Sequence, residues 1–385
     1  MTISQNTIPK GWSVKQIGDL LNFERPDNYI VESESYNQKN NIPVLTANKS
    51  FILGYTNEDF GIYKNIPAII FDDFTTDSKF VDFPFKVKSS AIKILKSKEE
   101  NYDLRFVYEL MKSINFQIAN HKRHYISQYQ YLEVKMPPIA EQKKIAEILS
   151  TVDEEIHKTS EIIAQTENLK NGISKHLFTR GVGHDKFQKT KIGDIPKEWN
   201  FLKMKDICTV SQGLQIPISK RFKDPGENRY KYITLKNIKE DTYEYIESPK
   251  ESVICKKDDV LMTRTGNTGV VVTDVEGVFH NNFFLIDFDR KRIDRNYLVY
   301  YLRGEPIKKL LLERAGTTTI PDLNHGAFYG IHFLLPDLTE QRKISDILSS
   351  IDNKILFNKE MRAKLTDLKK GLMQDLLSGN KRVKV

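Results

Sequence analysis

The sequence predicts an α+β fold in which two α/β domains accompany two long helices, with an internal pseudo-twofold repeat. Three observations support this prediction. The chain of 385 residues repeats its own motifs in two halves, and this length suits two domains with separate cores. Each half contains one uninterrupted amphipathic stretch of about 40 residues. The rest of each half alternates short β-type runs with a helical stretch, which is typical of α/β domains.

The repeat is clearest in the amphipathic stretches, where residues 138–150 return as 338–349. Glu141 and Glu340 are 199 positions apart, and the same distance separates Gly172 from Gly371. Repeats of this length are duplicated domains rather than solenoid units of 20–50 residues. They predict a pseudo-dimer, which suits a target that has two halves.

Two further motif pairs extend the repeat to the rest of the chain. Each half opens with a Pro-x-x-Trp motif, at residues 9–12 and 196–199, and these copies are 187 positions apart. A helical motif at residues 106–110 matches 298–302, at a distance of 192 positions.

Each amphipathic stretch is expected to form one helix, because apolar residues recur at helical spacing and Pro and Gly flank the ends. About 40 residues correspond to roughly 60 Å of helix. A single apolar stripe of that length needs a partner, and the other copy is the obvious one, which predicts a coiled coil. Ordinary packing against a domain core explains the stripe alone equally well. The helix starts and stripes comprise Glu141, Gln142, Ile145, Leu149, Val152 and Ile156 in the first copy, and Glu340, Gln341, Ile344, Leu348, Ile351 and Ile355 in the second.

The remaining sequence contains short runs of β-branched and aromatic residues separated by turn residues. One shorter helix is expected in each half, at about 101–116 and 295–313. Residues 181–195 are rich in Gly and polar residues, and we interpret them as a linker between the halves. The expected strands include residues 68–71, 91–95, 232–235, 259–262 and 283–286.

Composition excludes several classes of protein. A hydrophobic content of 39% with 29% charged residues is typical of a soluble globular chain, and no apolar run approaches the length of a membrane span. The N-terminus lacks the pattern of a secretory signal. Cys208 and Cys255 are the two cysteines, and neither belongs to a CxxC motif. These features predict a cytoplasmic protein without a structural zinc site and without a membrane partner.

The net charge of +8 favours a polyanionic partner, but the charge is distributed unevenly. Residues 139–185 carry 6 Lys and Arg against 8 Asp and Glu. This helical stretch is therefore a poor candidate for lying along phosphates, and the α/β domains are better ones.

Motifs for catalysis are weak. No [DN]PP[YF] loop of an amino-methyltransferase occurs, and neither a Gly-rich cofactor loop nor GxxxxGK[ST] is present. Asp337 with residues 352–354 matches a loose nuclease spacing, but this match lies on a predicted helix rather than a sheet. His280-Asn281-Asn282 resembles part of an HNH site without the second His. We therefore interpret the chain as a non-catalytic binding protein and assign no catalytic residue. The alternative is a self-contained DNA methyltransferase or nuclease.

Several loops combine cations, small polar residues and aromatic side chains, as DNA-contacting loops do. Residues 121–125 could place one cation on a phosphate and another on a base edge, although a solvated basic turn is the simpler alternative. Residues 263–269 surround an Arg with small hydrogen-bond donors and with Gly, which allows close approach of the backbone to a ligand. A simple hairpin turn would explain the glycines, but it would not explain the Arg and the Asn. The candidate DNA contacts are Thr46, Asn48, Lys49, Thr75, Thr76, Lys79, His121, Lys122, Arg123, His124, Tyr125, Lys220, Arg221, Arg264, Thr265, Asn267 and Asn281.

Taken in order, these motifs resemble the DNA-specificity subunit of type I restriction–modification systems over nearly the whole chain. The likeness rests on the two Pro-x-x-x-Glu-Gln helix openings at 137–142 and 336–341 with their apolar stripes. It also rests on the Pro-x-x-Trp starts, the Leu-Lys-x-Gly helix ends at 169–172 and 368–371, and the segment 258–266. The first half has no Arg-Thr-Gly turn. Its segment 69–76 resembles another subtype, so contacts should not be transferred between halves.

The resemblance implies two target-recognition domains, held apart by two antiparallel helices, that each read half of a bipartite, asymmetric site in double-stranded DNA. It implies that the helices dock two methyltransferase subunits and that restriction (motor-nuclease) subunits join them. S-adenosylmethionine, ATP and magnesium would belong to those partners, and this chain would hold no cofactor or metal. The implied segments are domain 1 at 1–138, the first spacer helix at 139–180, linker and domain 2 at 181–335, the second spacer helix at 336–379, and a basic tail at 380–385.

Overall fold

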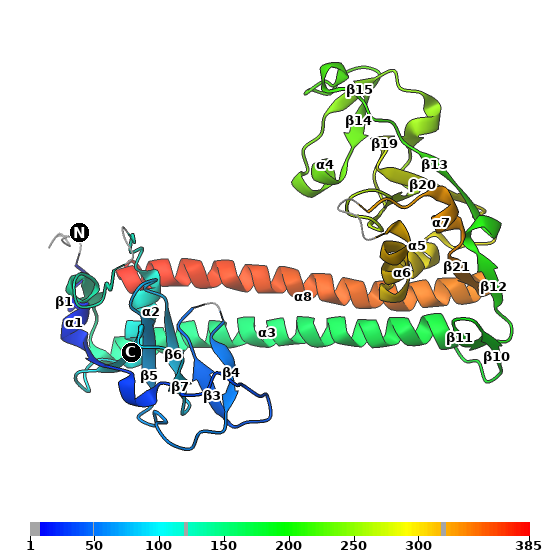
Figure 1. Cartoon of the computed structure of the whole chain (residues 1–385). Helices are drawn as coiled ribbons and strands as arrows, with labels where there is room; N and C mark the ends of the chain where they lie inside the picture. The colour runs from blue at the N-terminus through cyan, green and yellow to red at the C-terminus, as the bar shows by residue number, and fades with distance from the viewer. Residues whose placement is uncertain (1–7, 49, 119–121, 317–320) are drawn as a thin grey trace. The chain divides into compact units, whose positions relative to one another are not determined.

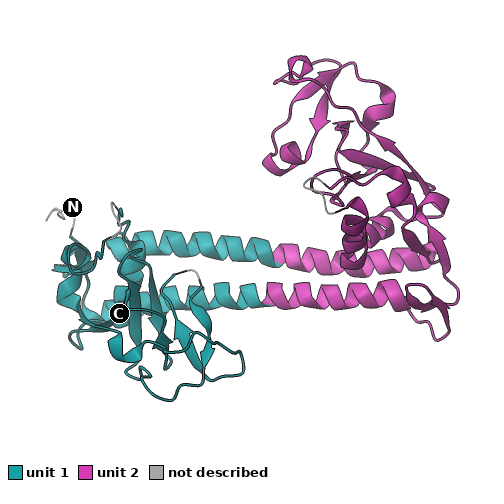
Figure 2. Ribbon diagram, viewed as in Figure 1, with its two compact units in different colours: residues 1–161, 358–385 teal, residues 162–357 magenta. Residues whose placement is uncertain are grey.

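The structure is a computed structural model that describes residues 8–48, 50–118, 122–316 and 321–385. The chain divides into two compact units (Figure 2). Unit 1 comprises residues 1–161 and 358–385, and unit 2 comprises residues 162–357. Each unit contains an α/β domain and a segment of each long helix, α3 (Ile139–Arg180) and α8 (Leu338–Ser378) (Figure 1).

Unit 1 builds its α/β domain from three small sheets. The first pairs β1 with β9, the second has the order β2-β8-β5-β6, and the third has the order β4-β3-β7, in which β3 and β7 are parallel. The helices α1 (Ile17–Leu20) and α2 (Leu104–Ser113) belong to the same domain. The strands are β1 (Ser13–Gln16), β2 (Leu21–Glu24), β3 (Ile42–Leu45), β4 (Ile52–Thr56), β5 (Ala68–Asp72), β6 (Ser78–Val81), β7 (Lys86–Val87), β8 (Ile92–Ser97) and β9 (Glu133–Met136).

Unit 2 repeats this plan. Its sheets pair β12 with β21, follow the order β13-β20-β17-β18, and follow the order β15-β14-β19-β16, in which β14 and β19 are parallel. The helices are α4 (Leu235–Glu240), α5 (Arg295–Arg303), α6 (Glu305–Ala315) and α7 (His325–Tyr329). The strands are β12 (Asn200–Lys203), β13 (Cys208–Gln212), β14 (Arg229–Ile233), β15 (Tyr245–Glu247), β16 (Ile254–Cys255), β17 (Val260–Thr263), β18 (Val271–Val272), β19 (Gly277–Phe279), β20 (Phe283–Phe288) and β21 (His332–Leu335).

The equivalence of the two domains extends to single residues. Ile69 pairs with Leu95 between β5 and β8, and Val260 pairs with Ile286 between β17 and β20. Both residues of the second pair lie 191 positions after those of the first. Four of the five expected strands are present, and the fifth, at 232–235, is strand only to Ile233, because Thr234 caps α4 and Leu235 begins it. The two halves therefore share the order of their main strands, whereas α4, α6 and β16 have no counterpart in the described part of unit 1.

Two details of the sequence prediction are corrected. The expected helix at 295–313 is two helices, because α5 ends before Gly304 and Pro306 stands in the first turn of α6, where it lacks an N–H to continue α5. Residues 181–195 are not only a linker, since β10 (Phe187–Thr190) and β11 (Gly193–Pro196) form a hairpin there.

The distance of 192 positions between the helical motifs is also wrong by one residue. Asp103 and Asp294 cap α2 and α5 by accepting the N–H groups of Phe106 and Tyr297. These caps are 191 positions apart, as the neighbouring strands are. The motif resemblance placed Phe106 opposite Leu298 because apolar residues flank this position on both sides.

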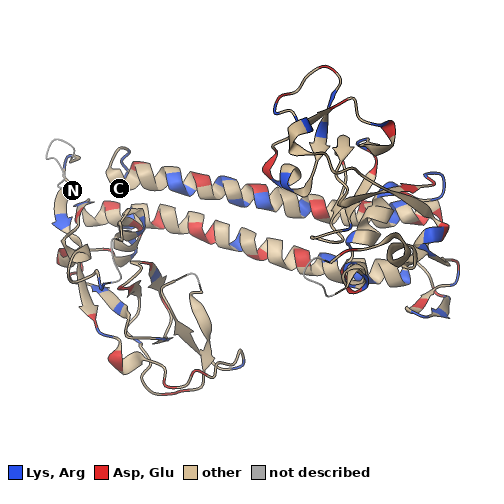
Figure 3. Cartoon of the chain, turned by 45° about the horizontal axis from the view of Figure 1, so that its top comes forward, with Lys and Arg blue, Asp and Glu red and all other residues tan. Residues whose placement is uncertain are grey.

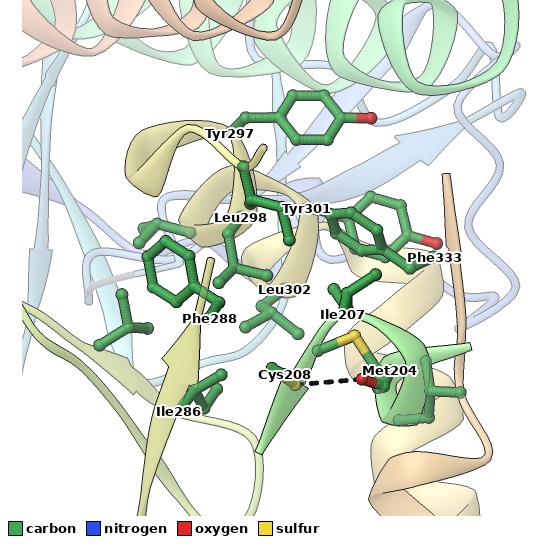
Figure 4. Packing of buried hydrophobic residues seen from close by; sticks show 14 of the residues in the cluster. Met204, Ile207, Cys208, Ile286, Phe288, Tyr297, Leu298, Tyr301, Leu302 and Phe333 are labelled. Carbon is green, nitrogen blue, oxygen red and sulfur yellow. Dashed lines mark hydrogen bonds between the residues drawn. The ribbon is translucent and has the colours of Figure 1, made fainter. Parts of the chain in front are cut away.

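The start of each long helix packs into the core of its own unit. Ile145 and Leu149 belong to the main hydrophobic cluster of unit 1, and Ile344 and Leu348 belong to that of unit 2. Figure 4 shows part of the latter cluster, where strand residues such as Ile286 and Phe288 pack with α5 residues. The simpler explanation of the stripe, packing against a domain core, therefore applies to the first turns of both helices.

Beyond these first turns, α3 and α8 pair with each other in antiparallel orientation. In unit 1, the Lys369 ammonium lies 2.5 Å from a carboxylate oxygen of Asp153. In unit 2, Lys170 makes the equivalent contact with Asp352, also at 2.5 Å. Asp352 follows Asp153 by 199 positions, and Lys369 follows Lys170 by the same distance. The duplicated helices thus exchange the same ion pair twice, as a pseudo-twofold repeat requires.

A glutamine fixes each long helix to its domain. The side chain of Gln142 accepts the N–H of Asp103 and donates to the carbonyl of Pro137 at 2.8 Å. Gln341 accepts the N–H of Asp294 and donates to the carbonyl of Pro336 at 2.9 Å. Because both amide groups are buried, they need these partners, and the partners fix where each long helix begins.

The adjacent glutamate is clamped by an indole and a basic side chain in both units. In unit 1, Glu141 accepts the Trp12 indole N–H at 3.1 Å and pairs with the guanidinium of Arg382, which follows α8. In unit 2, Glu340 accepts the Trp199 indole N–H at 2.8 Å and contacts His184, which follows α3. Each clamp therefore ties the opening of one long helix to the segment that follows the other.

The two clamps differ in their response to pH. Burial opposes the charged imidazole, but the carboxylates of Glu340 and Glu198 outweigh it and raise the pKa of His184 above 6.5. A pKa that is higher in the folded state stabilises the clamp fully below about pH 6.5, and this stabilisation is lost as the pH rises through the folded value. The guanidinium of Arg382 does not titrate in this range.

We therefore expect amide hydrogen exchange at residues 181–184 and 339–342 to accelerate, relative to the intrinsic rate, between pH 6 and 8.5. The corresponding residues of the unit 1 clamp should keep their protection, and His184→Gln should abolish the pH dependence. Equal changes in both clamps would contradict this assignment.

Candidate nucleic-acid interface

In unit 1, two candidate segments meet at the end of β5. The first is the strand-end turn, residues 72–77, in which the Asp72 carboxylate accepts the N–H groups of Phe74 and Thr75, both at 2.9 Å. Thr76 has a φ of 58°, and the turn closes through its N–H to the carbonyl of Asp72. Phe74 and Thr75 are consequently exposed at its tip.

The second segment is the return loop, residues 122–125. The His124 N–H donates to the Asp73 carbonyl at 2.8 Å, and the Tyr125 N–H donates to the Asp73 carboxylate at 2.8 Å. Asp73 thus joins the return loop to the strand-end turn. Lys122 and Arg123 are exposed beside it.

His124 and Tyr125 do not lie where a DNA-contacting side chain should. Both are buried, and the Tyr125 ring packs against Phe71 and Phe23. Burial and the charge of Asp73 raise the pKa of the Tyr125 phenol. These two side chains anchor the return loop, so their prediction as direct contacts is corrected: only Lys122 and Arg123 of the loop reach the surface.

The other candidates of unit 1 are more scattered. Thr46 is buried and hydrogen-bonds to Asn48, whose side chain is exposed. Lys79 is half-buried on β6. Lys49 and His121 lie outside the described residues.

In unit 2, the strand-end turn is residues 263–269, and its arginine is already engaged. The Arg264 guanidinium pairs with Asp322 at 2.8 Å, donates to the carbonyl of Leu323 at 3.4 Å and lies 5.4 Å from the centre of the Phe284 ring. Thr265 donates to the second oxygen of Asp322 at 2.5 Å. Arg264 and Thr265 therefore hold a neighbouring segment, whereas Asn267 is exposed at the tip.

That neighbouring segment is the return loop of unit 2, residues 321–324, which sequence reasoning missed. The N–H of Leu323 donates to the carbonyl of Arg264 at 2.8 Å. Residues 122–125 plus the helix repeat distance of 199 positions give 321–324, so the repeat itself contained the signal. It was missed because Ile320-Pro321-Asp322-Leu323 carries no cationic motif.

The remaining candidates of unit 2 serve different roles. Arg221 donates to the carbonyl of Ile216, pairs with Glu244 and covers the Tyr232 ring, so it stabilises its own loop. Lys220 beside it is exposed. Asn281 adjoins the strand-end turn, since the backbone carbonyl of its neighbour Asn282 accepts the N–H of Arg264. The side-chain oxygen of Asn281 is buried and has no hydrogen-bond partner among the described residues.

The helix starts and stripes are expected to contact the docked subunits, but only part of this set is accessible: Val152, Ile156 and Ile351 are half-buried, whereas the helix-start residues and Ile355 are buried. Glu141, Gln142, Ile145 and Leu149 are buried inside unit 1, and their counterparts in unit 2 are buried likewise. The exposed large apolar side chains of the helices are instead Ile162, Leu169, Leu356, Phe357, Met361 and Leu368. Figure 3 shows acidic and basic residues interspersed along both helices, as on surfaces that do not follow a phosphate backbone.

The nuclease motif has structural uses. Asp337 caps α8 by accepting the N–H of Glu340 at 2.9 Å, and Asp352 pairs with Lys170 and Tyr300. Their separation of 15 positions corresponds to about 22 Å of helix, too far for two ligands of one metal ion. In the part of the chain that the structure describes, no group of three or more metal-ligating side chains occurs.

Among the described residues, no helix combines the length and the apolar character needed to cross a bilayer.

Comparison with known proteins agrees with this geometry. Residues 9–168 and 196–367 match the family model described as the type I restriction modification DNA specificity domain. The chain belongs to this family. The two matched segments each contain one α/β domain and most of the long helix that follows it, so this DNA specificity domain occurs twice.

Curated relatives of this specificity-domain chain include two specificity subunits. The sequence is 37% identical over 195 residues to the type I restriction enzyme EcoR124I/EcoR124II specificity subunit of Escherichia coli, covering 48% of this chain and 46% of that relative. It is 26% identical over 409 residues to the MjaVIII specificity subunit of Methanocaldococcus jannaschii, covering 98% of this chain and 94% of the relative.

Solved structures share the fold of the specificity-domain chain. The type I restriction–modification S subunit from M. genitalium has a TM-score of 0.65 at 16% identity, with 98% of each chain covered. A chain from a structure of the type I R-M system, on complex assembly and conformational transition, has a TM-score of 0.58 at 16% identity and covers 97% of this chain and 99% of that one.

The family assignment confirms the predicted fold and a role in DNA specificity rather than catalysis. The alternative of a self-contained methyltransferase or nuclease is not supported. Within each domain, the described surface offers exposed polar side chains on the strand-end turn and the return loop.

The engaged state of Arg264 predicts a stability role. Arg264→Ala should lower the free energy of unfolding of unit 2 by about 1–2 kcal/mol, because it removes charge-assisted hydrogen bonds that are partly screened by solvent. Denaturant unfolding with hydrogen exchange at residues 321–324 measures this effect. Arg123→Ala is the matched control in unit 1 and should change stability by less than about 0.5 kcal/mol. Equal effects of both substitutions would contradict the difference between the two arginines.

Proposed function

We propose that this chain is the DNA-sequence-specificity subunit of a type I restriction–modification enzyme and binds a bipartite, asymmetric site in double-stranded DNA. One observation carries the proposal. The two domains repeat the strand pairing and the backbone contact that place the return loop, yet these loops carry different side chains at equivalent places, Arg123 in unit 1 and Asp322 in unit 2. One scaffold with two sets of loop residues is suited to reading two different half-sites.

Within unit 1, the exposed cations have distinct roles. Lys122 neutralises a phosphate, and Arg123 donates to a base edge in the major groove, where a guanidinium matches the O6 and N7 acceptors of guanine. Asn48 and Thr75 supply further polar contacts. In unit 2, the exposed side chains of Lys220 and Asn267 supply the corresponding polar contacts. Asp322 offers an acceptor suited to a cytosine amino group.

The long helices dock the modification subunits. Two methyltransferase subunits contact the exposed apolar side chains of α3 and α8, among which Leu356 and Phe357 are 56% and 61% exposed. Restriction subunits then join this complex, and the partners carry S-adenosylmethionine, ATP and magnesium. The names of the curated relatives, which are specificity subunits of restriction enzymes, support this division of labour.

The compartment follows from the same proposal, since the chromosome and its methyltransferases are cytoplasmic in a bacterium or archaeon. Both thiols suit a reducing environment, because they are free and buried, and burial raises the pKa of Cys208 and of Cys255 to about 12.

The proposal is tested by mixing the purified chain with its methyltransferase subunits, S-adenosylmethionine and genomic DNA. We expect methyl transfer by the mixture at a bipartite sequence and none by the chain alone, because this chain supplies recognition while its partners supply the chemistry. Methylation sequencing identifies the site. Methyl transfer by the chain alone, or the same methylated sequence without it, would refute the proposal.

A docking variant separates assembly from DNA recognition in this assay. Leu356→Lys with Phe357→Lys should weaken binding of the methyltransferase by about tenfold or more, since it places charges in an apolar contact. His157→Ala with Lys158→Ala changes the equivalent positions of α3, 199 residues earlier, and serves as the matched control. Unchanged assembly of the Leu356/Phe357 variant would exclude this surface.

Arg123 and Lys122 should affect recognition differently. Arg123→Ala should lower discrimination at the first half-site by about tenfold, since one bidentate contact discriminates by about 1–3 kcal/mol, and should leave the second half-site unaffected. Lys122→Ala should weaken binding to cognate and random DNA equally and reduce the slope of log K against log salt by roughly one. Competition binding of the assembled complex over a salt series measures both effects. A wild-type cognate-to-random ratio in the Arg123 variant would show that this residue does not read a base.

A further inference from the structure

Asp73 and Arg264 occupy the same position in the two domains. Asp73 directly follows β5 and Arg264 directly follows β17, and they are 191 positions apart, as those strands are. The N–H of Asp73 donates to the carbonyl of Ala91, and that of Arg264 donates to Asn282, again 191 positions later. In both domains the backbone of this residue is therefore fixed by the same neighbouring strand.

The same residue also receives the return loop in both domains. The carbonyl of Asp73 accepts the N–H of His124 at 2.8 Å. The carbonyl of Arg264 accepts the N–H of Leu323 at 2.8 Å, and Leu323 follows His124 by 199 positions. Both domains thus use the same backbone contact to place the strand-end turn beside the return loop, whatever the side chain at this position.

The side chains strengthen this contact with opposite charges. In unit 1, Asp73 pairs at 3.0 Å with Lys93 of β8, and its other oxygen accepts the N–H of Tyr125 at 2.8 Å. In unit 2, Arg264 covers the ring of Phe284, which lies 191 positions after Lys93, and reaches Asp322 in the return loop. An acid–base pair in one domain is replaced by a base–aromatic pair in the other.

Burial distinguishes the two arrangements. The side chains of Asp73 and Lys93 are 1% and 6% exposed, whereas Arg264 and Asp322 are 15% and 48% exposed. A buried ion pair contributes little net stability compared with apolar packing, but loss of one partner leaves an uncompensated charge. The Lys93 ammonium lies 4.8 Å from the centre of the Phe23 ring, which also contacts Tyr125 of the loop. Asp73 therefore contacts Tyr125 of the return loop directly, and Lys93 contacts it through the Phe23 ring.

We infer that Asp73 is a positioning residue for DNA recognition by unit 1: with Lys93, it holds the loop that presents Lys122 and Arg123 against the strand-end turn that presents Thr75. This inference rests on the proposed function. Asp73 is itself buried and touches no DNA; it acts on specificity through the placement of the exposed side chains.

The test uses the full chain assembled with its methyltransferase subunits and the methylated sequence found for the wild-type complex. Asp73→Asn keeps an acceptor for the Tyr125 N–H but leaves the Lys93 ammonium without its carboxylate. We expect a loss of about tenfold in the cognate-to-random affinity ratio at the first half-site, comparable to the loss of one base contact, with the second half-site unchanged. The double variant Asp73→Asn with Lys93→Met removes both charges and should recover most of the discrimination.

Lys96→Met is the matched control, because Lys96 also lies on β8 and its ammonium donates to the carbonyls of Asn65 and Pro67. It should leave discrimination at both half-sites at the wild-type value. Unfolding is measured in parallel, and binding is compared at a temperature where each variant is fully folded. If Asp73→Asn does not fold, Asp73→Glu, which retains the charge but displaces the carboxylate, replaces it with the same expected loss.

The outcomes separate the inference from the proposed function. A wild-type complex without sequence-selective binding would refute the proposed function itself. A selective wild-type complex with unchanged first-site discrimination in folded Asp73→Asn would overturn the inference alone. Equal losses at both half-sites, or no recovery in the double variant, would also overturn it, since a positioning pair in unit 1 acts on its own half-site and through its charge balance.

Discussion

A buried carboxylate at the start of each long helix is the constraint on which both units depend. Glu141 and Glu340 are almost completely removed from solvent, where an unpaired charge would be costly. Each is satisfied by an indole from the start of its half and by a basic side chain that follows the other helix. The opening of the domain, the start of one helix and the end of the other are therefore brought to one point in each unit. The buried glutamine beside each glutamate adds the capped helix of the domain to the same junction.

From these junctions outward, the two domains share the pairing of their main strands and the caps of α2 and α5. Strand pairings, caps and the ion pairs between helices recur at fixed distances along the chain. The shared scaffold fixes where the strand-end turns and return loops lie, and the loop residues then determine the chemistry each domain presents. A duplicated chain can therefore present different side chains from equivalent places, because the junctions at the long helices do not involve the loop residues.

The sequence predicted the periodic and repeated features well and the loops poorly, for a physical reason. Helical periodicity and duplicated motifs located the long helices within two residues, since burial of a long stripe constrains many positions together. The role of a loop residue depends on single partners far along the chain. The motif around Arg264 is typical of a base contact, but in the structure its guanidinium donates to Asp322, which lies 58 positions later in the chain. His124 and Tyr125 follow two exposed cations and share their motif, but their side chains turn inward to the core.

The opposite charges at Asp73 and Arg264 have a consequence for the modularity of this chain. The return loop of each domain is held by the residue that follows β5 or β17, which is Asp73 or Arg264. The side chain of that residue in turn contacts a residue of the neighbouring strand, Lys93 or Phe284. Grafting residues 122–125 alone into unit 2 would set them against an arginine that lacks its acidic acceptor, while the reverse graft would bring Asp322 close to the carboxylate of Asp73. The return loop, the residue that holds it and the neighbouring strand therefore form one block that must be exchanged as a whole. Recombination that exchanges whole domains at the long helices preserves this block, whereas piecemeal exchange of loops breaks it.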